Sequence, residues 1–223
     1  MIKTIIFDMD GTLIDSEPIW RIAEIAALEK VGIKLTEQML AENTAGMRND
    51  EVVKYWFNAF DYKKTEDAEM VQNAILDKVI ELIKIDGNKR ALEGIDYIFN
   101  FFKSKNIPIA LASSSPSKII TATLEAIGIE DKFVVKHSAE QEVLGKPNPA
   151  VFITTANLMN VKPENCLVFE DSVNGTLAAK AAKMKCVSIP AKHDYNRPQF
   201  GIADLKLKSL LEFTETELTK ISI

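Results

Sequence analysis

Short apolar runs recur along the chain and are separated by much longer stretches with helical patterns. The runs lie at residues 4–7, 107–112, 133–135, 166–169 and 187–190, with a weaker one at 202–205. Apolar runs this short, bounded by turn residues, are typical of strands buried on both faces of a parallel sheet. The alternation of such runs with helical stretches predicts the α/β fold class.

Residues 14–90 interrupt this alternation, because they contain helical patterns and no strand-like run. Helices are predicted over 19–31, from Asn49 onward and from Thr65 to about Lys84. The turn residues of 86–88 mark the return to the α/β pattern. We therefore predict a core domain made of residues 1–15 and 88–223, and a helical domain of residues 16–87 inserted after the first strand.

Composition excludes several classes of partner. The chain of 223 residues is 47% hydrophobic and 26% charged, as in ordinary globular proteins, and its net charge of −5 offers no basic excess for nucleic acid. Its two cysteines form no CxxC motif, which favours a reducing compartment. The acidic residues Asp8 and Asp10 stand where a signal peptide would need an apolar stretch. No apolar run approaches the roughly 18 residues of a membrane span. We expect a cytoplasmic protein without nucleic-acid or membrane partners; a monomer is the simplest assembly, although the sequence does not fix it.

Two carboxylates, Asp8 and Asp10, directly follow the first apolar run, and Gly11 and Thr12 come next. Side chains two residues apart at a strand end project to the same side. Two acids held together need a cation or a shared proton, although a polar turn would explain the same residues. An EF-hand calcium loop is excluded, because Leu13 stands where such a loop needs glycine.

Three further polar clusters follow or lie between apolar runs. Ser113, Ser114 and Ser115 precede a predicted helix, where hydroxyl and backbone N–H groups can bind an anion, although Ser115 would also serve as a helix cap. Lys146 lies between a glycine and a proline that constrain its backbone; an ordinary surface lysine is the alternative. Glu170 and Asp171 end the strand that begins at Cys166, and paired acids there are costly without a cation.

Strands of an open parallel sheet place their carboxyl ends along one edge, where ligands bind. The sequence therefore predicts that all of these clusters meet at that edge. Acids that can hold Mg²⁺, together with a hydroxyl and an ammonium that can hold a phosphate, are the groups that phosphoryl transfer needs.

In this order and spacing, the clusters resemble the four motifs of the haloacid dehalogenase-like hydrolases. The resemblance covers nearly the whole chain and implies a Rossmann-like parallel sheet core. The helical insert looks like the cap domain of the β-phosphoglucomutase-like subfamily. Segments 15–20, 46–48, 53–57 and 169–175 are most similar to bacterial sugar-phosphate phosphatases of the hexitol-phosphate and 2-deoxyglucose-6-phosphate type.

The resemblance implies covalent catalysis. Asp8 would attack phosphorus, and Asp10 would protonate the leaving oxygen and then deprotonate the attacking water. The implied cofactor is Mg²⁺, held by the carboxylates of Asp8 and Asp171 and by the main-chain carbonyl of Asp10. Glu170 would orient a water molecule or Lys146 without itself contacting the metal ion. The groups expected to bind the substrate's phosphate are Asp8, Asp10, Ser113, Ser114 and Lys146.

Three further residues are candidates for contacting the substrate. The guanidinium of Arg48 suits phosphate or polyol oxygens. Its alternative is a surface position at a helix start, because Asn49 has the character of an N-cap. Trp20 and Asn174 are also candidates, with core packing and helix capping as their respective alternatives.

We therefore expect a Mg²⁺-dependent phosphatase that acts on a small phosphorylated sugar or sugar alcohol through an aspartyl-phosphate. A β-phosphoglucomutase-type isomerase is one alternative, and a phosphate-binding module without catalysis is another. The intact pair Asp8 and Asp10 counts against the binding module. Trp20 counts against the mutase, because it stands where the mutases of the subfamily carry a histidine, and an indole has no titratable nitrogen.

Overall fold

The computed structural model describes residues 1–44 and 46–222. Within them, six parallel strands form one sheet in the order β3-β2-β1-β4-β5-β6. The strands are β1 Thr4–Phe7, β2 Ile109–Ser113, β3 Val135–Ser138, β4 Cys166–Glu170, β5 Lys185–Ser188 and β6 Leu205–Lys206. This is the order of a doubly wound sheet, so the predicted α/β, Rossmann-like fold is confirmed. The predicted runs at 133–135, 187–190 and 202–205 overlap only the ends of β3, β5 and β6.

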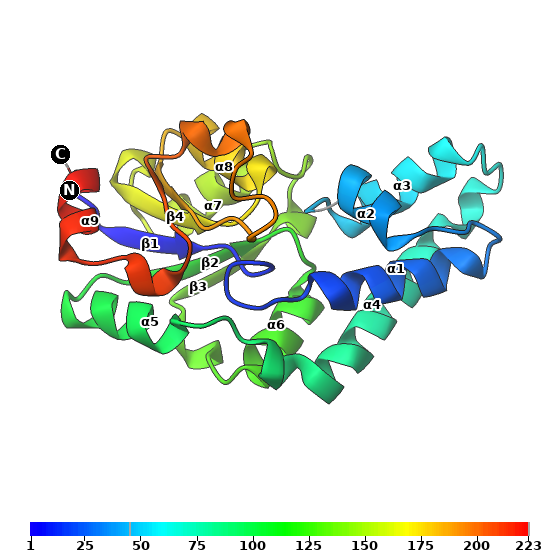
Figure 1. Cartoon of the computed structure of the whole chain (residues 1–223), viewed down its shortest axis with the longest axis horizontal. Coiled ribbons are helices and arrows are strands. Elements are labelled where there is room, and N and C mark those ends of the chain that lie inside the picture. Colours follow the sequence, from blue (N-terminus) through cyan, green and yellow to red (C-terminus); the bar gives the residue numbers. More distant parts are fainter. Residues whose placement is uncertain (45, 223) are drawn as a thin grey trace.

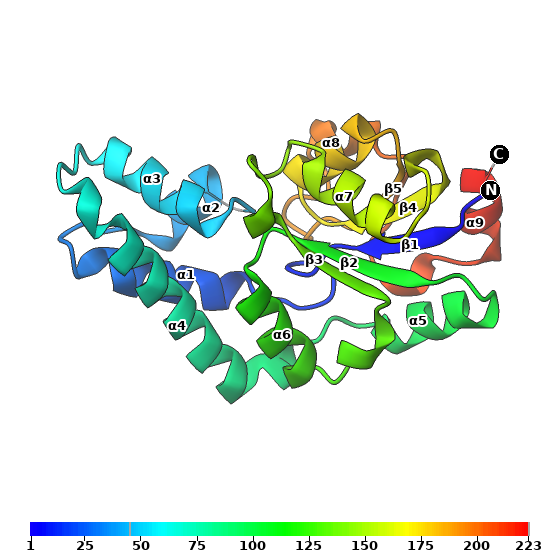
Figure 2. The same ribbon diagram turned by 180° about the vertical axis from the view of Figure 1, so that it is seen from behind.

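Helices cover both faces of this sheet and extend beyond one end of it. They are α1 Glu17–Glu29, α2 Glu37–Asn43, α3 Asn49–Ala59, α4 Ala68–Asp86, α5 Ile95–Ser104, α6 Ser117–Ala126, α7 Ala150–Leu158, α8 Val173–Ala181 and α9 Glu215–Ser222. Figures 1 and 2 show α5 and α6 on one face, α7 and α8 on the other, and α1 to α4 beyond the carboxyl ends of the strands. Short 3-10 turns lie at Thr65–Asp67, Gly87–Arg90, Glu130–Lys132, Ala139–Gln141, Pro163–Asn165, Pro198–Ile202 and Leu210–Glu212. In the part of the chain that the structure describes, no helix is both long and apolar enough to cross a membrane.

The central strand β1 explains why the sheet is covered on both faces. Ile5 and Phe7 are fully buried in one apolar cluster, and Ile6 between them is fully buried in another. The Phe7 ring packs against Phe169 of β4, with 4.8 Å between ring centroids, and against Phe99 of α5, with 5.3 Å. A strand that is apolar on both faces is stable only between two layers of helices, which is the arrangement found.

The chain passes between the sheet and the helices α1 to α4 twice, and the two passages lie side by side. Ile14 on the way out forms an antiparallel bridge with Ala91 on the way back. Asp15 N donates a hydrogen bond of 2.9 Å to Arg90 O. The division into a core of residues 1–15 and 88–223 and a cap of residues 16–87 stays a prediction, which this pairing supports. Helices α1 to α4 are called the cap below.

Candidate active site

The loop after β1 carries the two carboxylates predicted to be catalytic. Asp8 N donates a hydrogen bond of 2.9 Å to Phe169 O, so Asp8 is still fixed against β4, and its side chain is buried. Gly11 has φ of +82°, and a Cβ atom there would lie 2.0 Å from Oδ2 of Asp171. Only glycine combines this backbone turn with such a close approach, so the loop and Asp171 pack directly together.

Lys146 joins two of the acids from the loop before α7. Its Nζ lies 2.6 Å from Oδ1 of Asp8 and 2.8 Å from Oε1 of Glu170, and all three side chains are buried. Burial alone would lower the pKa of the Lys146 ammonium, but the carboxylates of Asp8 and Glu170 hold it above its ordinary value. Lys146 therefore carries a positive charge at the end of β1, where the sequence predicts a phosphate-binding ammonium.

Asp8, Glu170 and Asp171 form a compact carboxylate group, in which one oxygen from each lies within 4.8 Å of the others. Burial raises the pKa of Asp8 to about 8, against the lowering effect of Lys146. Burial also raises the pKa of Asp171 well above its ordinary value, and the negative charges of Glu170 and Asp8 add to the effect. Buried acids that repel one another fit a divalent cation, which prefers oxygen ligands. The site is therefore compatible with a metal ion.

Glu170 already has hydrogen-bond partners on both oxygens. In addition to Lys146 on Oε1, its Oε2 accepts hydrogen bonds from Ser172 N at 2.8 Å and Ser172 Oγ at 3.0 Å. A Cβ atom at Gly175 would lie 1.6 Å from Oε1 of Glu170. Any side chain at Gly175 would therefore displace the Glu170 carboxylate from the start of α8. These contacts are consistent with the predicted role of Glu170 in orienting Lys146, which stays a prediction.

The carboxylate of Asp10 lies outside the acidic group and is held by hydroxyl and indole donors. Oδ1 accepts hydrogen bonds from Ser16 Oγ at 2.5 Å and from Trp20 Nε1 at 3.1 Å. Oδ2 accepts from Ser115 Oγ at 2.7 Å and, at 3.4 Å, from Ser113 Oγ. Asp10 thus connects the first cap helix with the loop after β2. Its predicted contribution to the metal site is the main-chain carbonyl, and that prediction stays open.

The serines after β2 lie at the same edge of the sheet as Asp8. Ser113 is buried at the end of β2, and its Oγ accepts a hydrogen bond of 3.0 Å from Ser115 N, while Ser114 between them is half-buried. The N-cap of α6 is Pro116, so the alternative reading of Ser115 as a helix cap is wrong. Nothing in the sequence indicates that Ser115 and Ser16 reach Asp10, because both contacts depend on how the loops fold over each other.

Arg48 links the cap to the core through main-chain carbonyls. Its Nη1 donates to Ala139 O at 3.1 Å and to Glu142 O at 2.8 Å, while Nε and Nη2 donate to the carboxylate of Asp50 at 2.9 and 2.6 Å. Arg48 is itself the N-cap residue of α3, so the N-cap expected at Asn49 is wrong. The predicted contact of Arg48 with substrate stays a prediction, although these four hydrogen bonds occupy its guanidinium.

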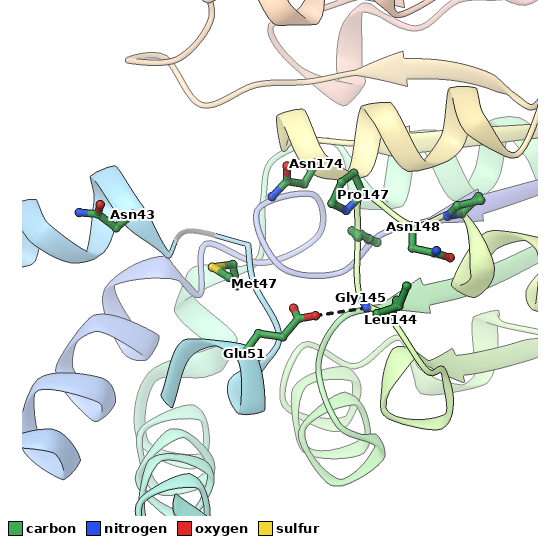
Figure 3. A pocket seen from close by; sticks show the side chains of 10 residues that line it. Asn43, Met47, Glu51, Leu144, Gly145, Pro147, Asn148 and Asn174 are labelled. Carbon is green, nitrogen blue, oxygen red and sulfur yellow. Dashed lines mark hydrogen bonds between the residues drawn. The ribbon is translucent and has the colours of Figure 1, made fainter. Parts of the chain in front are cut away.

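A pocket of about 780 Å³ opens beside Lys146, between the cap and the core. Figure 3 shows Met47 and Glu51 on its cap side and Pro147 and Asn174 on its core side. Pockets of this size suit small ligands. Asn174 therefore lies where a substrate contact was predicted, whereas Trp20 is not among the residues that line the pocket and instead contacts Asp10. Both roles stay predictions.

Residues 2–183 match the haloacid dehalogenase-like hydrolase family, so the chain belongs to this family. It is 35% identical over 213 residues to hexitol phosphatase B of Escherichia coli strain K12, which covers 96% of this chain and 95% of that protein. It is 33% identical over 183 residues to a phosphorylated carbohydrates phosphatase of Thermotoga maritima, covering 81% of each.

Among solved structures, the chain resembles β-phosphoglucomutase from Clostridium difficile with a TM-score of 0.89. The sequence identity is 26%, and the match covers 100% of this chain and 98% of that one. Together these comparisons confirm the predicted family, the resemblance to the β-phosphoglucomutase-like subfamily and the predicted enzyme class, a phosphoric monoester hydrolase.

Proposed function

We propose that the chain is a Mg²⁺-dependent phosphatase that hydrolyses small sugar phosphates or sugar-alcohol phosphates through an aspartyl-phosphate on Asp8. The observation that supports this most is the contact between Asp8 and Lys146, 2.6 Å apart at the end of β1 and beside a ligand-sized pocket. The similarity to proteins named hexitol phosphatase and phosphorylated carbohydrates phosphatase suggests the substrate class.

In the first step, a carboxylate oxygen of Asp8 attacks the substrate's phosphorus, and the bond from phosphorus to the sugar oxygen breaks. Asp10 donates a proton to that oxygen, so the sugar leaves as a neutral alcohol. Lys146 and the hydroxyl or N–H groups of Ser113 and Ser114 bind the phosphate oxygens and offset their charge. Trp20 and Ser16 keep the Asp10 carboxylate in place from the cap side.

In the second step, a water molecule attacks the phosphorus of the aspartyl-phosphate. Asp10, now ionised, accepts a proton from this water, and the bond between Asp8 and phosphorus breaks. Inorganic phosphate leaves and both carboxyl groups return to their starting states.

The residues proposed to hold Mg²⁺ are Asp8 and Asp171, through carboxylates, and Asp10, through its carbonyl. The raised pKa values of Asp8 and Asp171 support this assignment, because a cation would favour their ionised forms. When bound, Mg²⁺ supplies positive charge that reduces the repulsion between an anionic nucleophile and an anionic ester.

The structural similarity to a β-phosphoglucomutase favours a second candidate, an isomerase on the same scaffold. Trp20 argues against it. The indole donates to Asp10 but cannot titrate near neutral pH, so the chain lacks at this position the histidine of the mutases. Water therefore reaches the aspartyl-phosphate whenever Asp10 is aligned, and hydrolysis dominates.

The test measures phosphate release from a panel of phosphorylated sugars and sugar alcohols, with Mg²⁺ and after chelation by EDTA. We expect release that stops with EDTA and returns with Mg²⁺; activity that survives complete chelation contradicts the metal assignment. For the mutase, β-glucose 1-phosphate is supplied with and without glucose 1,6-bisphosphate. Glucose 6-phosphate formed much faster than inorganic phosphate would overturn the phosphatase proposal. The cytoplasmic location and the monomeric state stay predictions.

A further inference from the structure

Among the described residues, the pocket beside Lys146 is lined by one cationic side chain, one anionic side chain and the amides of three asparagines. We infer that this pocket selects phosphate monoesters whose remaining part is an uncharged, hydroxyl-rich chain, and that it discriminates against substrates with a second phosphate or a carboxylate. This inference rests on the proposed function. It adds a requirement that the part of the substrate released from the phosphate carries no charge.

The pocket has no cation to spare for a second anionic group. Among the described residues that line it, Lys146 alone is cationic, and no arginine or histidine contributes. The Lys146 ammonium is bonded to Asp8 and Glu170, at the end where the transferred phosphate binds. A second phosphate further along the pocket would therefore lose its hydration without gaining an ion pair, which is unfavourable.

Arg48 follows Met47, which lines the pocket from the cap, but the hydrogen-bond donors of its guanidinium already have partners. Its guanidinium is bonded to Asp50 and to the main-chain carbonyls of Ala139 and Glu142. To bind an anion in the pocket it would have to give up these contacts between cap and core. None of the described cap residues that line the pocket therefore offers a second anion a compensating positive charge.

Glu51 adds a negative charge to the same wall. Figure 3 shows its carboxylate directed at Gly145, and Oε1 accepts a hydrogen bond of 3.3 Å from Gly145 N, while Oε2 accepts one of 3.3 Å from Arg48 N. Glu51 has no ion-pair partner within 4 Å among residues 1–44 and 46–222. Arg48 offsets this negative charge only in part, because its guanidinium is paired with Asp50. The carboxylate of Glu51 therefore repels a phosphate or carboxylate in the pocket, and the repulsion is strong where water is displaced.

The remaining polar groups suit hydroxyls. Asn174 points its amide to the pocket (Figure 3), and this amide has no hydrogen-bond partner among the residues described. An amide both donates and accepts, as a hydroxyl does, and so can pair with successive hydroxyls of a polyol. Asn148 uses its Oδ1 for Ala150 N, at 3.0 Å, and keeps its NH₂ group for a ligand. The carboxylate of Glu51 can accept a hydrogen bond from a hydroxyl group. A fully ionised phosphate or carboxylate has no hydrogen to donate to it.

The experiment compares kcat/KM for two matched pairs of substrates. Fructose 6-phosphate and fructose 1,6-bisphosphate differ by a second phosphate, and glycerol 3-phosphate and 3-phosphoglycerate differ by a carboxylate. We expect the anionic member of each pair to be at least about 10-fold poorer, since roughly 1.4 kcal/mol of repulsion gives that factor. Equal kcat/KM within either pair overturns the inference.

Two variants assign the effect to the pocket. Glu51→Gln keeps an oxygen acceptor and removes the charge, so the bisphosphate-to-monophosphate ratio of kcat/KM should rise about 3- to 10-fold. Glu42→Gln removes the same charge from an exposed position of α2 outside the pocket and should leave that ratio unchanged. Asn174→Leu should raise KM for fructose 6-phosphate more than for p-nitrophenyl phosphate, which has no hydroxyls. An unchanged ratio in Glu51→Gln, or an equal effect of Asn174→Leu on both esters, contradicts the inference.

The same measurements separate this inference from the proposed function. If no monophosphate, p-nitrophenyl phosphate included, releases phosphate, the proposed phosphatase activity fails and the selectivity inference fails with it. If monophosphates are hydrolysed and bisphosphates are hydrolysed equally well, the phosphatase activity stands and only the selectivity inference fails.

Discussion

Trp20 Nε1 in the first cap helix donates a hydrogen bond of 3.1 Å to Oδ1 of Asp10 in the core. The proposed acid–base residue is therefore positioned partly by the cap. Ser16, at the N-cap of the same helix, donates to the same oxygen, so a movement of α1 would move both donors away from Asp10 together. Alignment of Asp10 thus depends on the position of the cap.

Replacing Trp20 with phenylalanine should lower kcat for sugar phosphates about 10-fold, because one hydrogen bond to a carboxylate is worth about 1.5 kcal/mol or more. Steady-state phosphate release measures the effect. Trp56→Phe is the matched control, since Trp56 Nε1 is buried in the cap and has no hydrogen-bond partner in the described chain. An equal loss in both variants would show that the cap is merely destabilised, and would refute the positioning role of Trp20.

Asp8→Asn should abolish steady-state turnover while the fold persists, because an amide cannot attack phosphorus to form the aspartyl-phosphate. Asp10→Asn should be slowed by about 100-fold or more, the usual contribution of general acid–base catalysis. Rapid quench with a labelled substrate should show transient phosphoenzyme in Asp10→Asn and none in Asp8→Asn. Substantial phosphate release by purified Asp8→Asn would refute nucleophilic attack by this residue.

Arg48→Ala should raise KM for sugar phosphates and for p-nitrophenyl phosphate by similar factors. The reason is that Arg48 contacts two core carbonyls and so stabilises the observed position of the cap on the core for any substrate. Arg48→Lys should not restore KM, because a lysine cannot reproduce the planar fork that bonds Asp50 and both carbonyls. A KM increase confined to sugar phosphates would instead support the direct substrate contact predicted from the sequence.

The cap should make folding stability depend on pH through Glu24. This residue is buried in α1, and burial raises its pKa to about 8, against a smaller lowering effect of Arg21. The folded chain keeps the proton to about pH 8, while the unfolded chain releases it near its ordinary value of 4.5. Because the folded state binds more protons in this window, its stability falls as pH rises from 4.5 to 8.

Relative to wild type, Glu24→Gln should therefore gain stability, by about 4 kcal/mol, between pH 4.5, where the two are similar, and pH 8. Urea unfolding at the two pH values measures the difference. Glu29→Gln, at an exposed position of the same helix, should show no comparable change with pH. If the stability difference between Glu24→Gln and wild type is the same at both pH values, Glu24 is not the source of the pH dependence.

The sheet and the acidic edge could be predicted because they depend on local patterns. Buried parallel strands are recognisable in the sequence as short apolar runs. Asp8, Lys146 and Glu170 lie together because parallel strands end at one edge of the sheet. Helix α5 was missed: its segment is rich in phenylalanine, which suits strands equally well, and it begins after Gly94 in a left-handed conformation rather than after a polar cap.

The contacts between cap and core could not be predicted in the same way. The bonds of Arg48 to Ala139 and Glu142 involve main-chain carbonyls, which carry no mark in the sequence. The hydroxyl of Ser16 and the indole of Trp20, at the start of the cap, reach the carboxylate of Asp10 in the core. Such contacts depend on how two folded units meet, and single-residue properties do not encode that.

The bridge between Ile14 and Ala91 has an evolutionary consequence. Because the outgoing and returning segments are hydrogen-bonded neighbours, everything between them can be exchanged or shortened with only a small gap to span. The order of the strands, and with it the chemistry at their ends, is untouched by such a replacement. New substrates can therefore be acquired by grafting a different insert onto an unchanged catalytic platform.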